Sequence, residues 1–171
     1  MRILLLVLGL VVVLILAVVV VGALLPKRHR VSRAASFRAA PNQLFALIAG
    51  PQNWRPNVLK FEPVSGGSSR ELVRETTRNG ETITYELLDS KPSQSIERRI
   101  ATENLPYSGA WFFSLKPEGG GTTVRITEDG DVYNPIFRFV SRFVIGHTRT
   151  IDDYLRALGK ATGQQEVQIR D

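Results

Sequence analysis

The stretch "WFFSLKPEGGGTTVRITEDGDVYNP", residues 111–135, carries the pattern that decides the fold. Apolar side chains recur at every second position on both sides of the break "KPEGGG": first Trp111, Phe113 and Leu115, then Val124 and Ile126. Alternation around a Pro/Gly-rich break predicts a β-hairpin. The sequence "YNP" then predicts the start of a helix, because Asn caps helices and Pro fits the first helical position.

The acidic run "EDGD", residues 128–131, raises the alternative of a metal site. An EF-hand loop needs alternate oxygen ligands, a fixed Gly and a distant Glu, and that spacing is absent. His29 and His147 form no metal-binding pattern, and the chain has no Cys, which excludes disulfides, thiol catalysis and Cys-type zinc sites. We therefore interpret the run as part of a strand and expect neither a metal nor a cofactor.

The N-terminal segment, residues 3–25, contains no charged residue and no Pro. A helix of this length spans roughly 34 Å, enough to cross a hydrocarbon core of about 30 Å. A cleaved secretory signal has a shorter apolar core and a small-x-small cleavage site, whereas this run ends in "GALLPKRHR". The sequence predicts an uncleaved transmembrane helix that anchors the chain in the bilayer.

Basic residues cluster directly after the apolar run, in a segment at 26–33 that we expect to be a juxtamembrane linker. The cations are Lys27, Arg28, Arg30 and Arg33. The chain has 22 Lys and Arg against 16 Asp and Glu, and without Arg2 and these four the balance is 17 to 16. We expect the cluster to bind anionic lipid headgroups and the near-neutral remainder to bind no nucleic acid. The positive-inside rule predicts a single-pass cell-membrane protein whose C-terminal domain is cytoplasmic.

The rest of the chain predicts an α+β layer structure. A strand at 31–39 and a short helix at 41–50 precede six strand segments between 58 and 132, with turns such as "SGGSS" (65–69) between them. A long amphipathic helix is expected over about 135–160, followed by a flexible tail at 164–171. Its apolar stripe steps by three or four residues: Ile136, Val140, Val144, His147, Ile151, Tyr154 and Leu158.

Three stretches together resemble the SRPBCC (START-like, polyketide cyclase/dehydrase) superfamily. They are "FRAAPNQLFALIAGPQNWRPNV", "NLPYSGAWFFSLKPEGGGTTVRITEDGDV" and "NPIFRFVSRF…YLRALGKA". The resemblance covers about residues 31–163. It implies a helix-grip fold, in which a seven-stranded curved antiparallel sheet wraps round the C-terminal helix and a cavity between them holds apolar ligands. We assign this ligand-binding domain to 34–163.

Strand parity places three polar groups on apolar faces, namely Arg98, Glu128 and His147. They are candidates for orienting a ligand in a cavity. In the structural alternative, Arg98 and Glu128 pair at the rim of the sheet, His147 satisfies a carbonyl near Gly146, and a bulge after Ile126 turns Glu128 outward. The complete set of cavity candidates is Tyr85, Arg98, Trp111, Phe113, Glu128, Val140, Val144, His147 and Ile151.

Three functions remain open from the sequence. The first is a membrane-anchored binding module for a lipid or other hydrophobic small molecule held in an internal cavity. The second is a cyclase/dehydratase-like enzyme with Glu128 or His147 as general base and Arg98 stabilising negative charge. The third is a cavity-free interaction scaffold. The sequence contains neither a nucleophile elbow nor a phosphate loop, so no catalytic motif favours the enzyme.

Overall fold

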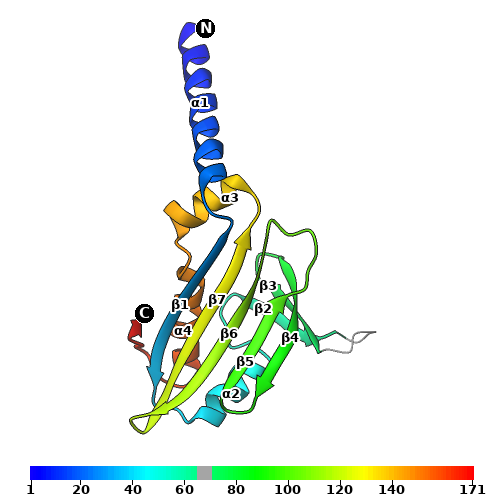
Figure 1. Ribbon diagram of the computed structural model, residues 1–171, viewed down its shortest axis with the longest axis vertical. Coiled ribbons are helices and arrows are strands. Elements are labelled where there is room, and N and C mark those ends of the chain that lie inside the picture. The colour runs from blue at the N-terminus through cyan, green and yellow to red at the C-terminus, as the bar shows by residue number, and fades with distance from the viewer. Residues whose placement is uncertain (65–70) are drawn as a thin grey trace.

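The computed structural model describes residues 1–64 and 71–171, so the expected turn "SGGSS" lies outside the described residues. The described elements are α1 (Arg2–Leu24), β1 (Arg28–Phe37), α2 (Pro41–Ala49), β2 (Val58–Pro63), β3 (Leu72–Thr77), β4 (Thr82–Lys91), β5 (Ser95–Ile100), β6 (Tyr107–Glu118), β7 (Gly121–Val132), α3 (Pro135–Val140), the π-helical turn η1 (Ser141–Ile145), α4 (Arg149–Ala161) and β8 (Ile169–Arg170) (Figure 1).

Within the described residues, eight strands form a single sheet in the order β2-β3-β4-β5-β6-β7-β1-β8. Each pair of neighbouring strands is antiparallel. The predicted hairpin is confirmed: β6 and β7 pair in continuous register from Tyr107 opposite Val132 to Glu118 opposite Gly121. The turn is shorter than the Pro/Gly-rich break indicated, because Gly119 and Gly120 both adopt positive φ and close it in two residues.

The core lies between the sheet and the two helices α2 and α4. Side chains that are at most 1 % exposed meet there from three directions: Leu44 and Ile48 of α2, Ile151, Leu155 and Leu158 of α4, and Ile96, Val124 and Ile126 of the sheet. Their strands follow the predicted parity. The α+β architecture, with a large antiparallel sheet and a C-terminal helix against it, is thereby confirmed.

The expectation of one unbroken helix over 135–160 is wrong. The chain forms α3, widens into η1, breaks at Gly146 and restarts as α4. Gly146 has φ +80° and ψ 140°, a backbone conformation that side chains disfavour and glycine tolerates. The break divides the predicted apolar stripe, so that Ile151 is fully buried and Val144 is 69 % exposed.

The expected linker and the expected flexible tail are also different in the structure. Strand β1 begins at Arg28, which lies opposite Asp131 of β7, so only residues 25–27 connect α1 to the sheet. In the tail, β8 pairs with Ala34 and Ala35 of β1. The side chain of Gln164 also donates to the carbonyl of Ser36, at 3.2 Å. Both segments contribute strand residues to the sheet: the expected linker forms the first part of β1, and the expected tail contains β8, which pairs with β1.

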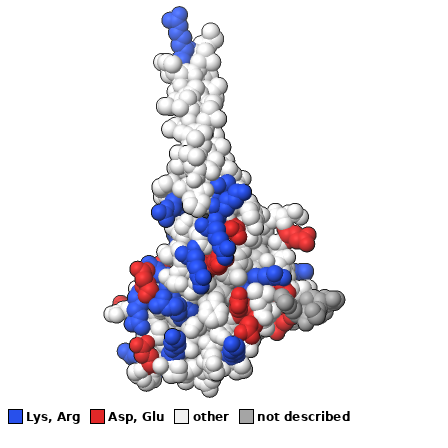
Figure 2. All heavy atoms as spheres, viewed as in Figure 1, with Lys and Arg blue, Asp and Glu red and all other residues white. Residues whose placement is uncertain are grey.

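Helix α1 is the single described helix whose length and composition would allow it to cross a membrane. It projects away from the domain as an apolar rod, and its last turn lies against α3 (Figure 1). In the space-filling view the rod is almost free of charge, and basic side chains gather where it meets the domain (Figure 2).

Candidate functional site

A small cavity of about 80 Å³ lies between the inner face of the sheet and α4. Its walls come from the turn after α2, from the five strands β2 to β6 and from α4: Gln52, Arg55, Phe61, Glu75, Tyr85, Arg98, Trp111, Phe113, Thr150 and Tyr154. The lining therefore combines aromatic rings with a buried charged cluster, an arrangement suited to orienting a partly polar ligand group.

An ion pair between Arg55 and Glu75 forms the polar part of this wall. Arg55 Nη1 lies 2.7 Å from Glu75 Oε2, and the two side chains are 14 % and 4 % exposed. Arg55 also donates to Gln52 Oε1 at 3.0 Å, and Gln52 in turn donates to the carbonyl of Ile48. Glu75 thus has the partner that a buried carboxylate requires.

Arg98 points inward from β5, as strand parity predicts, and is 8 % exposed. Its Nη2 donates to the carbonyl of Ala49 at the C-terminal end of α2, where a cation is favoured, and its guanidinium lies 5.7 Å from the centre of the Phe61 ring. Burial lowers the pKa of Arg98. Arg98 does not pair with Glu128, so the rim ion pair considered from the sequence is not formed.

Two tyrosine hydroxyls face the same interior. Burial raises the pKa of Tyr154, against an opposing effect of Arg55, and burial followed by the charge of Glu75 raises the pKa of Tyr85. Both hydroxyls are therefore protonated at neutral pH. The Tyr154 hydroxyl is buried and makes no hydrogen bond of good geometry with any described residue. It is a donor that a bound molecule could use.

Glu128 belongs to a second polar cluster. Its Oε2 accepts a hydrogen bond from Trp111 Nε1 at 2.9 Å, and its Oε1 lies 3.1 Å from His29 Nε2. The ring of His29 stacks on that of His147, with centroids 4.2 Å apart. Glu128 therefore faces inward, and the bulge considered after Ile126 is absent from the β6–β7 register.

The environment of His147 disfavours its charged form. Burial lowers the pKa of His147, the charges of His29 and Arg142 lower it further, and Glu128 opposes them. His29 fits into this cluster because its neighbour across the strands is Gly130: a Cβ there would lie 2.7 Å from the imidazole carbon Cε1 of His29. No group of at least three potential metal ligands is found in the described part of the chain.

The sequence candidates divide into three groups. Tyr85, Arg98, Trp111 and Phe113 line the small cavity, whereas Glu128 and His147 form the second cluster. Of the remaining candidates, Ile151 lies in the core, Val140 is half-buried and Val144 is exposed. Assigning Val144 to a cavity wall is wrong, because the break at Gly146 removes it from the face of α4.

Sequence reasoning missed several wall residues, chiefly Arg55, Glu75 and Gln52. Glu75 could have been found, because it stands two positions after the buried Val73 on β3 and therefore shares its face. Arg55 lies in a Pro-bracketed turn that has no periodicity, so its inward direction carries no sequence signal. His29 was assigned to a linker and therefore had no strand parity.

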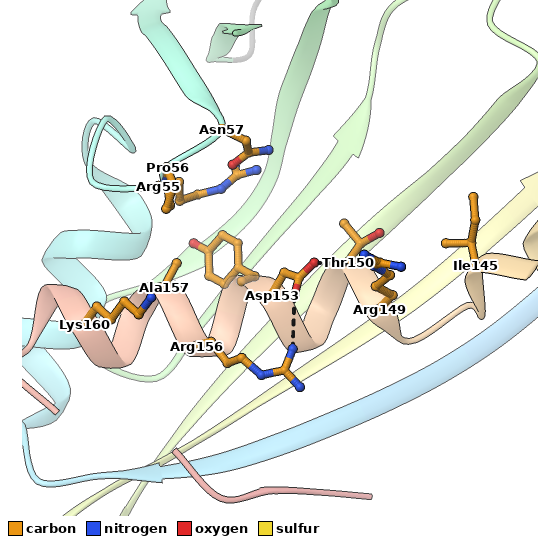
Figure 3. Close-up of a pocket in the computed structure, with 11 residues that line it drawn as sticks. Arg55, Pro56, Asn57, Ile145, Arg149, Thr150, Asp153, Arg156, Ala157 and Lys160 are labelled. Atoms are coloured by element: carbon orange, nitrogen blue, oxygen red, sulfur yellow. Dashed lines mark hydrogen bonds and ion pairs between the residues drawn. The ribbon is translucent and has the colours of Figure 1, made fainter. Parts of the chain in front are cut away.

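A larger open groove of about 550 Å³ runs along α4, between that helix and the turn that carries Arg55 (Figure 3). Its lining residues are Arg55, Pro56, Asn57, Ile145, Arg149, Thr150, Asp153, Tyr154, Arg156, Ala157 and Lys160. Arg55, Thr150 and Tyr154 also line the small cavity and form the wall between the two spaces. The groove contains four basic side chains and one acidic side chain, Asp153, which accepts from Arg156 at 3.0 Å.

The sequence model of the family described as "polyketide cyclase / dehydrase and lipid transport" matches residues 28–161. The chain belongs to this family. Three solved structures share the fold of this polyketide cyclase/dehydrase family member at 11–17 % identity, a level that supports the fold alone. No curated protein matches the chain.

The first of these structures is the Zhui aromatase/cyclase from Streptomyces sp. R1128, with 17 % identity and a TM-score of 0.62 over 78 % of this chain and 93 % of that chain. The second is protein MLL2253 from Mesorhizobium loti, with 14 % identity and a TM-score of 0.60 over 81 % and 99 %. The third is norcoclaurine synthase from Thalictrum flavum, with 11 % identity and a TM-score of 0.59 over 79 % and 94 %.

Proposed function

We propose that this protein is a membrane-anchored binding module for an amphiphilic small molecule that has a hydrophobic body and an acidic head. The groove of about 550 Å³ carries this proposal, because its size falls among small-molecule sites, which span about 300–1,000 Å³. The small cavity, at about 80 Å³, has room for only a few waters at about 30 Å³ each. The ligand is therefore assigned to the groove and not to an internal cavity.

The charge of the groove favours an acidic head. Arg149 and Arg156 flank Asp153 on α4, and Lys160 lies one turn further along. A carboxylate or phosphate placed there gains charge-assisted hydrogen bonds, which are roughly twice as strong as neutral ones. The ring of Tyr154 and the side chains of Ile145 and Ala157 supply apolar contact for the rest of the ligand.

Membrane attachment through α1 is the second part of the proposal. Its support is the length, apolar composition and exposure of that helix. Three exposed cations follow α1, namely Lys27, Arg28 and Arg30, of which Arg28 is paired with Asp129. Only Arg2 precedes the apolar part of the helix. This excess of positive charge after the helix favours a single-pass protein with a cytoplasmic domain. Arg33 contributes less to headgroup binding than expected, because it is paired with Asp152 and Asp171. Tethering raises the concentration of the groove near membrane-dissolved ligands.

The test is binding of a fluorescent long-chain carboxylate to the full-length protein in nanodiscs. Lys160→Glu combined with Arg156→Glu should weaken binding at least about tenfold, or about 1.4 kcal/mol. Lys116→Glu, an exposed charge reversal on β6, is the matched control and should leave binding unchanged. The corresponding long-chain alcohol should bind all variants alike. Equal carboxylate binding by the groove variant and the control would refute the proposed site.

A second candidate function is supported by the protonated tyrosines of the small cavity. Tyr85 and Tyr154 stand near Arg98 and could protonate a carbonyl substrate whose reactive end enters that cavity, as a cyclase/dehydratase-like reaction requires. If so, Tyr154→Phe should abolish turnover of a polyketone substrate and leave carboxylate binding in the groove intact. Turnover that survives in Tyr154→Phe would remove this residue from the reaction.

A further inference from the structure

Five large apolar side chains on α3 and η1 are exposed, because the rest of the domain does not cover them. They form what we call the apolar collar: Ile136, Phe137, Phe143, Val144 and Ile145, each at least 45 % exposed. Single exposed apolar residues are ordinary on protein surfaces, but a concentration of them within one short segment marks an interaction site. The collar therefore needs a partner.

The collar is attached to the end of α1. Gly22 lies directly on the backbone of Pro135, where a Cβ would come within 1.9 Å of the carbonyl oxygen. Arg138 is 8 % exposed and donates from Nη1 to the carbonyls of Ala23 at 3.3 Å and Leu25 at 2.9 Å. Its guanidinium thus satisfies carbonyls that the end of a helix leaves unpaired. The segment α3 is consequently held across the base of α1 (Figure 1).

Basic side chains are exposed at the same level. Lys27, Arg28 and Arg30 follow α1, and Arg142 stands within η1 between collar residues. Figure 2 shows Lys and Arg side chains gathered around the base of the apolar rod. Apolar and aromatic side chains interspersed with cations are typical of segments that lie in the headgroup layer of an anionic membrane.

We propose that the apolar collar is embedded in the interfacial layer of an anionic phospholipid bilayer, in the leaflet from which α1 emerges. This inference rests on the proposed membrane anchoring. Continuity with α1 identifies the partner, because the collar begins at the helix end and a bilayer that surrounds α1 reaches it without a gap. Ile145 belongs to both the collar and the groove, so one end of the groove opens at the lipid surface.

The absence of cysteine from the chain allows a clean test with single-cysteine variants. The variants are Phe143→Cys and Val144→Cys in the collar, Leu14→Cys in α1, and Phe112→Cys on β6, where Phe112 is 41 % exposed. The full-length chain is placed, at one copy per disc, in nanodiscs of phosphatidylcholine and phosphatidylglycerol. Reaction with a membrane-impermeant maleimide is then followed, and a polarity-sensitive label reports contact with lipid.

The collar variants should react at least about tenfold more slowly than Phe112→Cys, which corresponds to about 1.4 kcal/mol of protection. Their labels should be quenched by lipids that carry a nitroxide near the headgroup. If the collar reacts as fast as Phe112→Cys while Leu14→Cys is protected, the collar lies in water and the inference fails although anchoring stands. If Leu14→Cys also reacts, anchoring itself fails. Protection that occurs only with several copies per disc would assign the collar to a second copy of the chain and overturn the inference.

Discussion

Arg55 is the residue on which the interior charge balance depends most. It pairs with Glu75, which is 4 % exposed on the inner face of β3, and it forms part of the wall between the cavity and the groove. Replacing it by Met keeps the bulk of the side chain and removes the charge. The buried Glu75 then loses its ion-pair partner.

Arg55→Met should lower the free energy of unfolding by about 3–5 kcal/mol, the usual cost of breaking a buried pair. Arg55→Met combined with Glu75→Leu should recover most of that loss, because a buried pair gives little net gain over apolar packing. The control is Lys60→Met, which breaks the exposed pair with Glu62 and should cost about 0–1 kcal/mol. Urea unfolding of the full-length protein in detergent micelles measures all three. Equal losses in Arg55→Met and Lys60→Met would show that the interior pair is solvated.

His147 should make stability depend on pH. Its pKa in the folded state lies below the ordinary value of 6.5, so between these two values the unfolded chain binds more protons. The free energy of unfolding should therefore be highest above about pH 6.5 and fall as the pH is lowered through this window. His147→Gln, which leaves His29, Arg142 and Glu128 in place, should flatten this slope between about pH 7 and 5. If the free energy of unfolding fell equally steeply with pH in the parent and in His147→Gln, His147 would not be the source of the pH dependence.

At the scale of elements, the break between η1 and α4 determines which surface each helix presents. The helix α4 buries its apolar side chains against the sheet, and α3 with η1 turns its own outward. The positive φ of Gly146 makes this change of direction possible. The short break at residues 146–148 thus separates a core helix from an exposed apolar segment.

Gly146→Ala should lower the free energy of unfolding by about 1–3 kcal/mol, because a Cβ is strained at this φ and ψ. Open space surrounds the position, so the loss would come from the backbone conformation and not from a collision. Thr148→Ala is the control: its side chain makes no cap hydrogen bond, and the change should stay within about 0.5 kcal/mol. If Gly146→Ala left the free energy of unfolding unchanged, the break between η1 and α4 would not depend on this backbone conformation.

The elements that the sequence predicted best are those whose side chains alternate. Strand parity placed Phe113, Ile126 and Arg98 correctly on the inner face, and "YNP" placed a helix start at Pro135, where Asn134 accepts from the amides of Ile136 and Phe137. Strand β8 and the first residues of β1 were missed because their order depends on pairing with distant strands and not on local pattern. For the same reason no sequence period indicated the Arg55–Glu75 contact.

At the scale of the whole molecule, α1 and the domain are held in one arrangement. The contact of Gly22 with Pro135 and the bonds from Arg138 fix the helix end from one side, and the strand β1 follows after residues 25–27 on the other. Val132 also donates to the carbonyl of Lys27, so the connection itself is part of the sheet edge. The domain therefore has a defined orientation relative to the helix axis.

Gly22→Leu should loosen this arrangement, because its Cβ would collide with the backbone of Pro135. The control is Gly9→Leu, which has nothing within 4 Å of its Cβ. Spin labels at Leu10→Cys and Phe112→Cys, both exposed positions, report the distance between helix and sheet in nanodiscs. The distance distribution should be narrow in the parent and in Gly9→Leu, and clearly broader in Gly22→Leu. A broad distribution in the parent would contradict a fixed orientation.

The short connection at residues 25–27 has a consequence for how a ligand would be transferred to and from the protein. A freely diffusing carrier searches a volume, whereas the domain of the proposed membrane-anchored protein, held this close to its helix, would stay within its own height of the lipid surface. Under the proposed function, donors and acceptors of the ligand would reach it by lateral movement within the same membrane, or would dock on it from the adjoining aqueous phase. Encounter frequency would then follow the surface density of the partners, and it would be insensitive to the volume of the compartment.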